Sequence, residues 1–403
     1  MIDAPAPQLS GVPPLSTLPT RAEVRAAIPD HCFERSTLRS FGYLLFSAAV
    51  VGALVAGAIA FIPVSWAWTP IWALYAIATG TAATGLWVIA HECGHGAFSK
   101  HAWLQDTVGY ILHTALLVPY FSWQRSHSVH HAKTNHLEEG ETHVPKRITE
   151  SKGLAAMRRK GKLGETTYTA ITLTSTLLFG WPLYLLLGAT SGPARARANH
   201  FWPAAPFRSE LFPQRWVARV WASTVGIVVV LGLLVWAAIT WGVGTIIALY
   251  VGPLLVTNAW LVLYTWLQHT DVDVPHFSDS EWKWLLGAFQ TIDRPYPKVI
   301  DVLHHKIGTT HVAHHIDHRI PHYHAEEATE AIKAAFPEWY RFEPTPIARA
   351  TWRVARDCVA VDQIAPADGW TFEAADDRTF EVPDARTFEA ADAQTFEVPD
   401  ANA

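Results

Sequence analysis

Charged residues are scarce in this chain of 403 residues: they make up 17%, against about 25% in an ordinary soluble domain. Half of the residues are hydrophobic. Cysteine is scarcer still, because Cys32, Cys93 and Cys358 are odd in number and far apart. This excludes a disulfide framework and suits a reducing compartment. The net charge of −5 gives no reason to expect a nucleic-acid partner.

The first 40 residues also lack the features of two kinds of targeting signal. They contain no apolar core of the sort found in a signal peptide. They are rich in Pro, and they do not have the Arg- and Ser-rich, acid-poor composition of an organellar transit peptide. We therefore expect residues 1–40 to be a cytosolic N-terminal segment.

Lys and Arg are absent from two long segments, between Arg39 and Lys100 and between Arg219 and Lys283. A membrane-spanning helix needs about 20 mostly apolar residues. Five apolar stretches have about that length: 41–62, 71–90, 168–190, 217–239 and 245–267. If the first two and the last two form hairpins, every Lys and Arg falls on one side of the membrane. The positive-inside rule makes that side cytosolic.

Two apolar stretches, residues 168–190 and the shorter 107–121, fit this topology less well. A fifth span at 168–190 would put residues 91–167 and 268–403 on opposite sides. Gly180-Trp181-Pro182 also interrupts the stretch, and Pro inside a helix removes a backbone hydrogen bond. We expect both stretches to be interfacial or re-entrant, although spanning as a pair would preserve the topology. The predicted fold is an all-α integral membrane protein with four transmembrane helices in two hairpins.

Three histidine clusters lie beyond the ends of these spans. They are His91-Glu92-Cys93-Gly94-His95, His127-Ser128-Val129-His130-His131 and His311-Val312-Ala313-His314-His315. Residues i, i+3 and i+4 share one face of a helix, so the histidines of each cluster project together, as metal ligands must. The topology, which was drawn without the histidines, places all three clusters on the cytosolic side. Eight imidazoles exceed the four ligands that one zinc takes, and this favours two metals.

The type of ligand does not identify the metal, because imidazole binds iron, zinc, copper and nickel. A further candidate ligand is His269, at the cytosolic end of the last span, and Asn258 lies deeper in that helix. We assign ordinary surface or core roles to His31, His101, His113, His143 and His200. A ligand role stays open for His304, His305, His318, His322 and His324.

Two other functions use similar residues. The first cluster also fits the H-E-x-x-H motif, in which two histidines bind zinc and the glutamate, here Glu92, is the base of a metalloprotease. A protease of this kind needs one metal and leaves six clustered histidines unexplained. A metal transporter would place its ligands near the bilayer midplane, whereas these clusters lie beyond the spans. A two-metal enzyme accounts for more of the pattern.

Six segments of the chain resemble membrane fatty acyl desaturases, in particular the oleate-type Δ12 (omega-6) branch, in the order of that branch. They are AIPDHCFERSTLRSF (27–41), HECGHGAFS (91–99), DTVGYILHTALLVPYFSWQRSHSVHHAKTNH (106–136), LQHTDVDVPHF (267–277), GAFQTIDRPY (287–296) and THVAHHIDHRIPHYHAEEATEAIK (310–333). The resemblance implies a di-iron centre, dioxygen as the oxidant and four spans with a cytosolic helical cap. It also implies the metal ligands His91, His95, His127, His130, His131, His269, His311, His314 and His315.

The resemblance further implies where the electrons come from and where the enzyme resides. Zinc has no redox chemistry, so iron suits the removal of hydrogen from an unactivated methylene. The chain carries no haem or flavin motif and no fused cytochrome b5 segment, so two electrons must come from a separate donor. In the endoplasmic reticulum membrane this would be cytochrome b5 with its reductase. A plastid enzyme would use ferredoxin, but no transit peptide is visible.

The expected reaction places a cis double bond in a fatty acyl lipid, with oleoyl-phospholipid converted to linoleoyl. The sequences HECGH and HVAHH are closer to the Δ12 branch than to omega-3 desaturases. Hydroxylases, acetylenases and conjugases share this scaffold and stay open as alternatives. Glu92 is expected at most to hydrogen-bond a ligating imidazole.

The C-terminus departs from the resemblance. From residue 370 an eight-residue unit is repeated four times, as WTFEAADD, RTFEVPDA, RTFEAADA and QTFEVPDA. Short acidic repeats cannot bury a core. We therefore expect residues 41–362 to form a membrane desaturase domain and residues 363–403 to form a disordered acidic tail.

Overall fold

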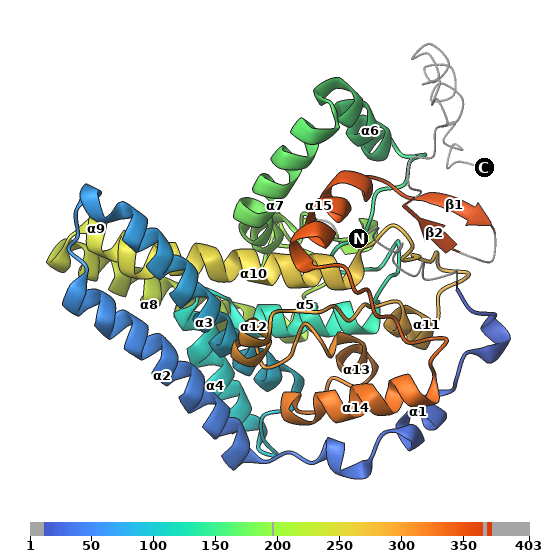
Figure 1. Cartoon of the computed structure of the whole chain (residues 1–403), viewed down its shortest axis with the longest axis horizontal. Coiled ribbons are helices and arrows are strands. Elements are labelled where there is room, and N and C mark those ends of the chain that lie inside the picture. Colours follow the sequence, from blue (N-terminus) through green and yellow to red (C-terminus); the bar gives the residue numbers. More distant parts are fainter. Residues whose placement is uncertain (1–11, 196, 366–368, 373–403) are drawn as a thin grey trace, which may run out of the picture. The chain divides into compact units, whose positions relative to one another are not determined.

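The computed structural model describes residues 12–195, 197–365 and 369–372. Most of the described chain is helical (Figure 1), as expected. A short antiparallel pair of strands, β1 (Asp362–Ala365) and β2 (Gly369–Thr371), follows the last helix.

All five of the longer apolar stretches form helices. Among the described residues, five helical segments are long and apolar enough to cross a membrane. They are built from α2 (Thr37–Phe61), α3 (Thr69–His95), α7 (Glu165–Leu187), α8 (Val217–Trp241) and the run of α9 (Val243–Ile246), the π-helix η6 (Ile247–Val251) and α10 (Gly252–His269). The four expected spans therefore coincide with helices, and α7 is a fifth helix of sufficient length.

The helix α7 corrects one expectation, because Gly180-Trp181-Pro182 does not interrupt it. Pro182 lies inside the continuous helix. The missing N–H of Pro182 removes one backbone bond, a loss that apolar membrane helices tolerate when neighbouring groups adjust. Gly180 lets α7 pack closely on α10, since a Cβ there would lie 3.2 Å from Val262. Elsewhere on α7, Phe179 and several leucines are exposed.

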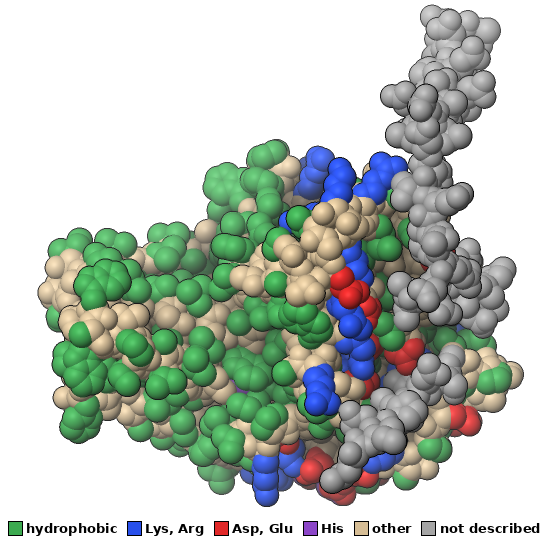
Figure 2. All heavy atoms as spheres, turned by 45° about the horizontal axis from the view of Figure 1, so that its top comes forward, with side chains coloured by type: hydrophobic (Ala, Val, Ile, Leu, Met, Phe, Trp, Pro, Cys, Tyr) green, Lys and Arg blue, Asp and Glu red, His purple; other side chains and the backbone are tan. Residues whose placement is uncertain are grey.

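The surface divides into an apolar part and a charged part. Figure 2 shows hydrophobic side chains on one side of the molecule and Lys, Arg, Asp and Glu gathered on the other. The apolar part includes exposed leucine, valine, isoleucine and tryptophan side chains of α2 and α8. An exposed apolar area of this extent marks a surface that contacts lipid or protein. This division follows the two segments of the sequence that lack Lys and Arg.

Shorter helices complete the fold. They are α1 (Arg21–Ala27), α4 (Ala102–Ala115), α5 (Tyr120–Ala132), α6 (Ser151–Leu163), α11 (Trp284–Phe289), α12 (Lys298–Leu303), α13 (His311–Ile316), α14 (His322–Ala335) and α15 (Ile347–Asp357). Thr20 and Glu23 form a capping box that starts α1. The stretch 107–121 does not form a long helix, because α4 ends at Ala115 and α5 begins at Tyr120.

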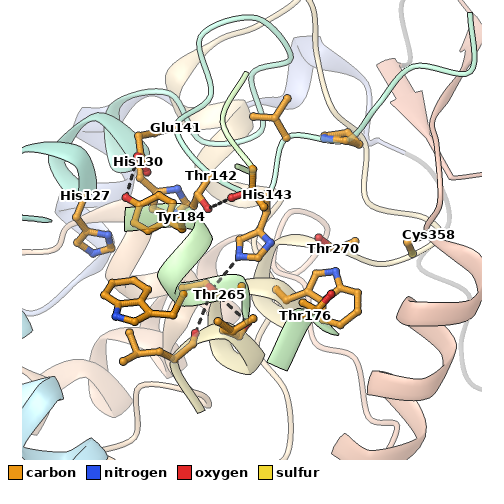
Figure 3. A pocket seen from close by; sticks show the side chains of 18 of the residues that line it. His127, His130, Glu141, Thr142, His143, Thr176, Tyr184, Thr265, Thr270 and Cys358 are labelled. Carbon is orange, nitrogen blue, oxygen red and sulfur yellow. Dashed lines mark hydrogen bonds between the residues drawn. The ribbon is translucent and has the colours of Figure 1, made fainter. Parts of the chain in front are cut away.

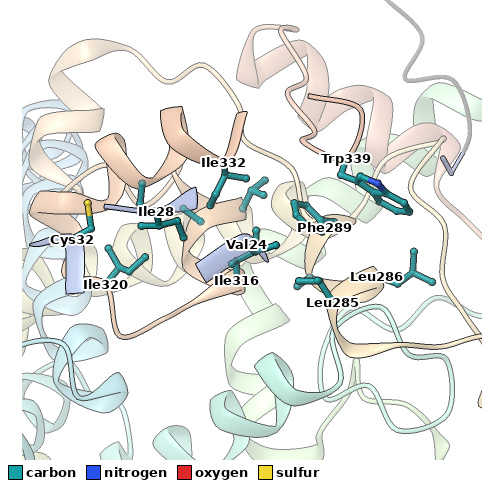
Figure 4. Close-up of a cluster of buried hydrophobic side chains, with 14 of the residues drawn as sticks. Val24, Ile28, Cys32, Leu285, Leu286, Phe289, Ile316, Ile320, Ile332 and Trp339 are labelled. Atoms are coloured by element: carbon teal, nitrogen blue, oxygen red, sulfur yellow. The ribbon is translucent and has the colours of Figure 1, made fainter. Parts of the chain in front are cut away.

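A hydrophobic core lies among α1, α11, α13 and α14 (Figure 4). Its largest fully buried side chains include Phe289, Ile332 and Trp339. Val24 and Ile28 of the N-terminal segment are also buried in this core. The part of residues 1–40 that the structure describes is therefore packed into the same folded unit as the helices that follow.

The structure describes the start of the segment expected to form the acidic tail. The strand β2 contains Trp370 and Thr371 from the first repeat, and Trp370 exchanges two backbone hydrogen bonds of 2.8 Å with His276. Phe372 is buried against Leu137 and Val361. Trp370 and Phe372, at the start of the first repeat, supply apolar surface that the composition of the repeat did not indicate. Residues 373–403 of the expected tail lie outside the described residues.

A buried ionic network holds the chain that follows α10. Arg294 is fully buried and contacts Asp271, at 2.7 Å, and Glu343. Its Nε also donates to the carbonyl of Leu267. Arg353 adds a second cation beside Asp271, at 2.6 Å. Burial raises the pKa of Asp271, but the charges of Arg294 and Arg353 outweigh burial and lower it overall.

Removing Arg294 should strongly destabilise the protein. Arg294→Met leaves Asp271 and Glu343 buried without their main cation, and losing one partner of a buried ion pair costs about 3–5 kcal/mol. We expect a lower midpoint of thermal unfolding in detergent. Because the folded state lowers the pKa of Asp271, its contribution to stability should be present above about pH 4 and lost on further acidification.

The matched control is Arg349→Met, since Arg349 lies exposed on α15. It should unfold at the same temperature as the unchanged protein. Equal midpoints for the two variants would show that the network does not stabilise the fold.

Candidate metal centre

Four segments bring together all nine histidines predicted as ligands. The C-terminal end of α3 carries His91 and His95, and α10 ends at His269. The other six come from α5 and α13: His127, His130, His131, His311, His314 and His315. The i, i+3 and i+4 spacings therefore place the ligands on helix faces, as expected.

Two glycines adapt α3 to this site. A Cβ at Gly94 would lie 2.7 Å from the ring of Trp123, so glycine lets α5 approach α3 closely. Gly96 has a φ of 78° and ends the helix directly after His95. This left-handed conformation costs glycine little. The short motif thus supplies two ligands, a close helix contact and a helix end.

The ring nitrogens form two groups. The first contains His91, His95, His127, His131 and His314, and the second contains His130, His269 and His315. His311 joins the second group, with its Nε2 2.9 Å from that of His269. Other Nε2 pairs lie at 3.0 Å (His91 and His127) and 3.1 Å (His130 and His269). Metal–nitrogen bonds of about 2.1 Å put neighbouring ligand nitrogens roughly 3.0–3.4 Å apart, so these separations fit two metals.

Burial keeps the imidazoles of α5 and α13 neutral. Burial, with neighbouring histidines, holds the pKa of His127, His131, His314 and His315 well below its usual value, and lowers that of His130 to about 3. A neutral imidazole has a lone pair for a metal. The buried Nε2 atoms of His314 and His315 have no hydrogen-bond partner among the described residues. This set of donors fits a pair of metal ions.

Contacts behind the ligands orient them. Thr134 donates its hydroxyl hydrogen to the carbonyl of His130, so it accepts a hydrogen bond from His315 Nδ1, at 3.1 Å. The Nε2 of His315 is then left to face a metal. Asp293 accepts the backbone N–H of Val312, at 2.9 Å, and so holds the start of α13.

Glu92 also accepts a hydrogen bond from a backbone N–H group. Its Oε2 accepts the backbone N–H of His322, the first residue of α14, at 2.9 Å. Its Oε1 lies 3.8 Å from His91 Nδ1. This separation is too long for a hydrogen bond, and His91 Nδ1 has no hydrogen-bond partner among the described residues, so the contact expected between Glu92 and an imidazole is not formed.

An apolar cavity opens beside His127 and His130 (Figure 3). Its volume is about 250 Å³, and its walls include Trp87, Trp123, Trp181, Leu261 and Val262. In Figure 3 the ligands His127 and His130 lie on one side and Cys358 on the other. The cavity therefore leads away from the metal ligands between apolar walls.

The cavity also contains polar groups that were not predicted from the sequence. The hydroxyl of Tyr184 lies 2.8 Å from Glu141 Oε1 and 2.9 Å from Ser126 Oγ. Burial raises the pKa of Glu141 to about 8, so this carboxyl is protonated at neutral pH. His143, which was assigned an ordinary role, lines the cavity and contacts Thr265 at 2.8 Å. Single residues of these types carry no spacing signal, so only the fold reveals them.

Phe372 is another lining residue that sequence analysis missed. It belongs to the first acidic repeat, whose composition indicated a solvated tail. The cavity wall thus includes a side chain from a segment outside the family resemblance.

The remaining histidines have varied surroundings. His200 bonds the carbonyl of Leu185, and His304 links Thr81 to Tyr264, so both hold the fold together. The ring of His318 lies 4.6 Å from that of His95, close to the first metal-ligand group. His31 and His324 meet in a separate cluster.

Comparison with known proteins decides the family. The fatty acid desaturase family model matches residues 66–345. The chain belongs to the fatty acid desaturase family. It is 42% identical to a Delta(12)-acyl-lipid-desaturase of Punica granatum, over 87% of this chain and 88% of the relative. It is likewise 42% identical to an omega-6 fatty acid desaturase, endoplasmic reticulum isozyme 2, of Glycine max, over 89% and 93%.

A third relative is named as a hydroxylase and not as a desaturase. The oleoyl-12-hydroxylase of Ricinus communis is 41% identical, over 87% of this chain and 89% of the relative. Membership of the desaturase family confirms the expected class of enzyme, an oxidoreductase, and not a metalloprotease.

Substitutions at Glu92 and His91 should separate a supporting contact from a ligand. Glu92→Gln keeps an oxygen that can accept the N–H of His322, and Glu92→Asp keeps the charge on a shorter side chain. Removing a residue that supports a metal ligand typically lowers metal affinity or activity 10–100-fold. We expect both variants to keep their metal and to desaturate within about tenfold of the unchanged enzyme, whereas His91→Ala loses both.

The measurement is metal content and desaturated product at matched expression. A Glu92→Gln enzyme with full metal and no product would give the carboxylate a direct part in the reaction.

Proposed function

We propose that the enzyme is an acyl-lipid desaturase that introduces a Δ12 cis double bond into an oleoyl chain and gives a linoleoyl chain. The observation that carries the proposal is an apolar cavity with two groups of closely spaced imidazoles at its side. An unactivated hydrocarbon chain needs apolar walls, and its oxidation needs a redox-active metal. The names of the Punica granatum and Glycine max relatives support oleate and the omega-6 position.

Two iron ions would occupy the histidine groups, with five ligands in one and four in the other. Bound there with dioxygen and two external electrons, they would supply the oxidising power to remove two hydrogens from neighbouring methylenes. The external electrons would come from cytochrome b5 and its reductase.

The protein's own residues would bind and orient the acyl chain. Trp87, Trp123 and Trp181 exclude water from the cavity, and Leu261 and Val262 add apolar walls. His127 and His130 both line the cavity and belong to different ligand groups, so an acyl chain beside them would lie next to both metals. The bond that is oxidised would depend on how far the chain extends past these two histidines.

A hydroxylase is the second candidate, because the Ricinus communis relative is nearly as similar as the desaturases. It would use the same ligands and cavity and place oxygen on the acyl chain instead of forming a double bond. The omega-3 desaturase alternative would shift the acyl chain along the same cavity.

For location we propose an endoplasmic reticulum membrane protein with four spans, α2, α3, α8 and α9–α10, and a cytosolic active site. The placement of Lys and Arg supports this topology. The helix α7 would then lie at the interface, with Phe179 and its leucines towards lipid. The endoplasmic reticulum name of the Glycine max relative supports this location.

Expression in a host that makes oleate but not linoleate tests the activity. The unchanged chain should produce linoleate, and His130→Ala should produce none at equal protein level, because it removes a ligand beside the cavity. Fatty acid profiling by gas chromatography gives the product. A hydroxylated acyl chain as the main product would favour the second candidate, and no product from well-folded, iron-loaded enzyme would contradict both.

Tags in short loops test the topology. Tags in 63–70 and at 242 should report the lumenal side, and tags near 150, 205 and 300 should report the cytosol, because every Lys and Arg lies on the latter side. Protease protection of tagged protein in sealed microsomes gives the readout. A lumenal tag at 205 would mean that α7 crosses the membrane.

A further inference from the structure

A separate cluster of metal-ligand side chains lies where the N-terminal segment meets α14. It contains His31 and Cys32 of the 3-10 helix η2 (Asp30–Phe33) and His324 and Glu327 of α14. One ligand atom from each of the four residues lies within 4.8 Å of the other three. Residues almost 300 positions apart in sequence therefore converge on one point.

The separations in this cluster suit a tetrahedral ion. His31 Nε2 lies 2.8 Å from Glu327 Oε2 and 3.9 Å from Cys32 Sγ. Zinc bonds of about 2.0–2.3 Å to nitrogen, oxygen and sulfur put neighbouring ligand atoms roughly 3.3–3.7 Å apart. The two observed separations lie on either side of this range, so small side-chain shifts would bring the atoms to it.

One side of the cluster is buried and the other is open to solvent. Cys32 is fully buried, whereas the side chains of His31 and Glu327 are each about half exposed, at 51% and 52%. A cation could therefore reach the cluster from water and find the sulfur at its base. Burial raises the pKa of the Cys32 thiol, so the ion would displace the thiol proton on binding.

Two arginines lie near the cluster. Arg25 is paired with Asp30 at 2.9 Å, and Arg39 lies over the ring of Tyr323 with its Nη1 3.5 Å from His324 Nε2. An ion bound through His324 Nε2 would displace this long contact. Burial and the nearby Arg39 lower the pKa of His324, which favours its neutral form. A carboxylate and a thiolate would together balance a divalent cation.

We propose that His31, Cys32, His324 and Glu327 form a structural zinc site, distinct from the two histidine groups, that fastens the N-terminal segment to α14. This proposal does not rest on the desaturase reaction. Cysteine, histidine and carboxylate are zinc ligands, and four protein ligands are typical of a structural site. The site would also support the metal centre, because His322 at the start of α14 donates its N–H to Glu92 beside His91.

Cobalt(II) is the sharpest probe, because cobalt bound to a thiolate gives a charge-transfer absorption band. Neither histidine group contains a cysteine ligand, so such a band reports the new site. We expect purified full-length protein in detergent to show the band at one cobalt per chain, and equimolar zinc to remove it. Cys32→Ser and His324→Ala should lose the band.

Two variants serve as controls. Cys358→Ser removes another cysteine, and His101→Ala removes an exposed histidine outside the cluster. Both should keep the band. A wild-type protein without the band, or a band that Cys32→Ser leaves unchanged, would overturn the proposal.

Zinc content provides a second measurement. The unchanged protein should hold one more zinc per chain than His324→Asn, with equal iron in the two proteins. Equal iron shows that the variant is folded, and His324→Asn is a mild change that guards against misfolding. Equal zinc in the two proteins would mean that the hydrogen bond between His31 and Glu327 is the whole role of the cluster.

Discussion

The structure depends on holding nine imidazoles close together. Like-charged histidines at separations near 3 Å would repel one another strongly, and burial lowers the pKa of the six histidines on α5 and α13, which removes that charge from them. Several of the buried ring nitrogens have no hydrogen-bond partner among the described residues, which is compatible with a metal site. The C-terminal ends of α3 and α10 and the helices α5 and α13 bring these imidazoles together.

The carboxylates near the ligands act mainly on backbone groups. Glu92 accepts from the start of α14, Asp293 accepts from the start of α13, and Asp271 with Arg294 holds the chain just after His269. Each contact fixes a segment that carries a ligand or lies beside one. The acidic groups around the candidate metal centre therefore position the segments that carry its histidines.

Much of the centre could be predicted because its signal is local. The spacing in each cluster puts ligands on one helix face whatever the rest of the chain does. His269 had a weaker signal, its place at the end of the last span, because it is a single residue whose partners come from distant segments. The helix through Pro182, the burial of Phe372 and the meeting of His31 with His324 depend on tertiary packing, which composition and periodicity do not encode.

The ordered start of the repeat region has a practical consequence for anyone who shortens or fuses this protein. Composition alone suggests cutting the chain after residue 362, where the acidic tail was expected to begin. A cut there would remove β2 and Phe372 and open one wall of the apolar cavity to water. A fusion partner or stop codon placed after residue 372 leaves that wall whole.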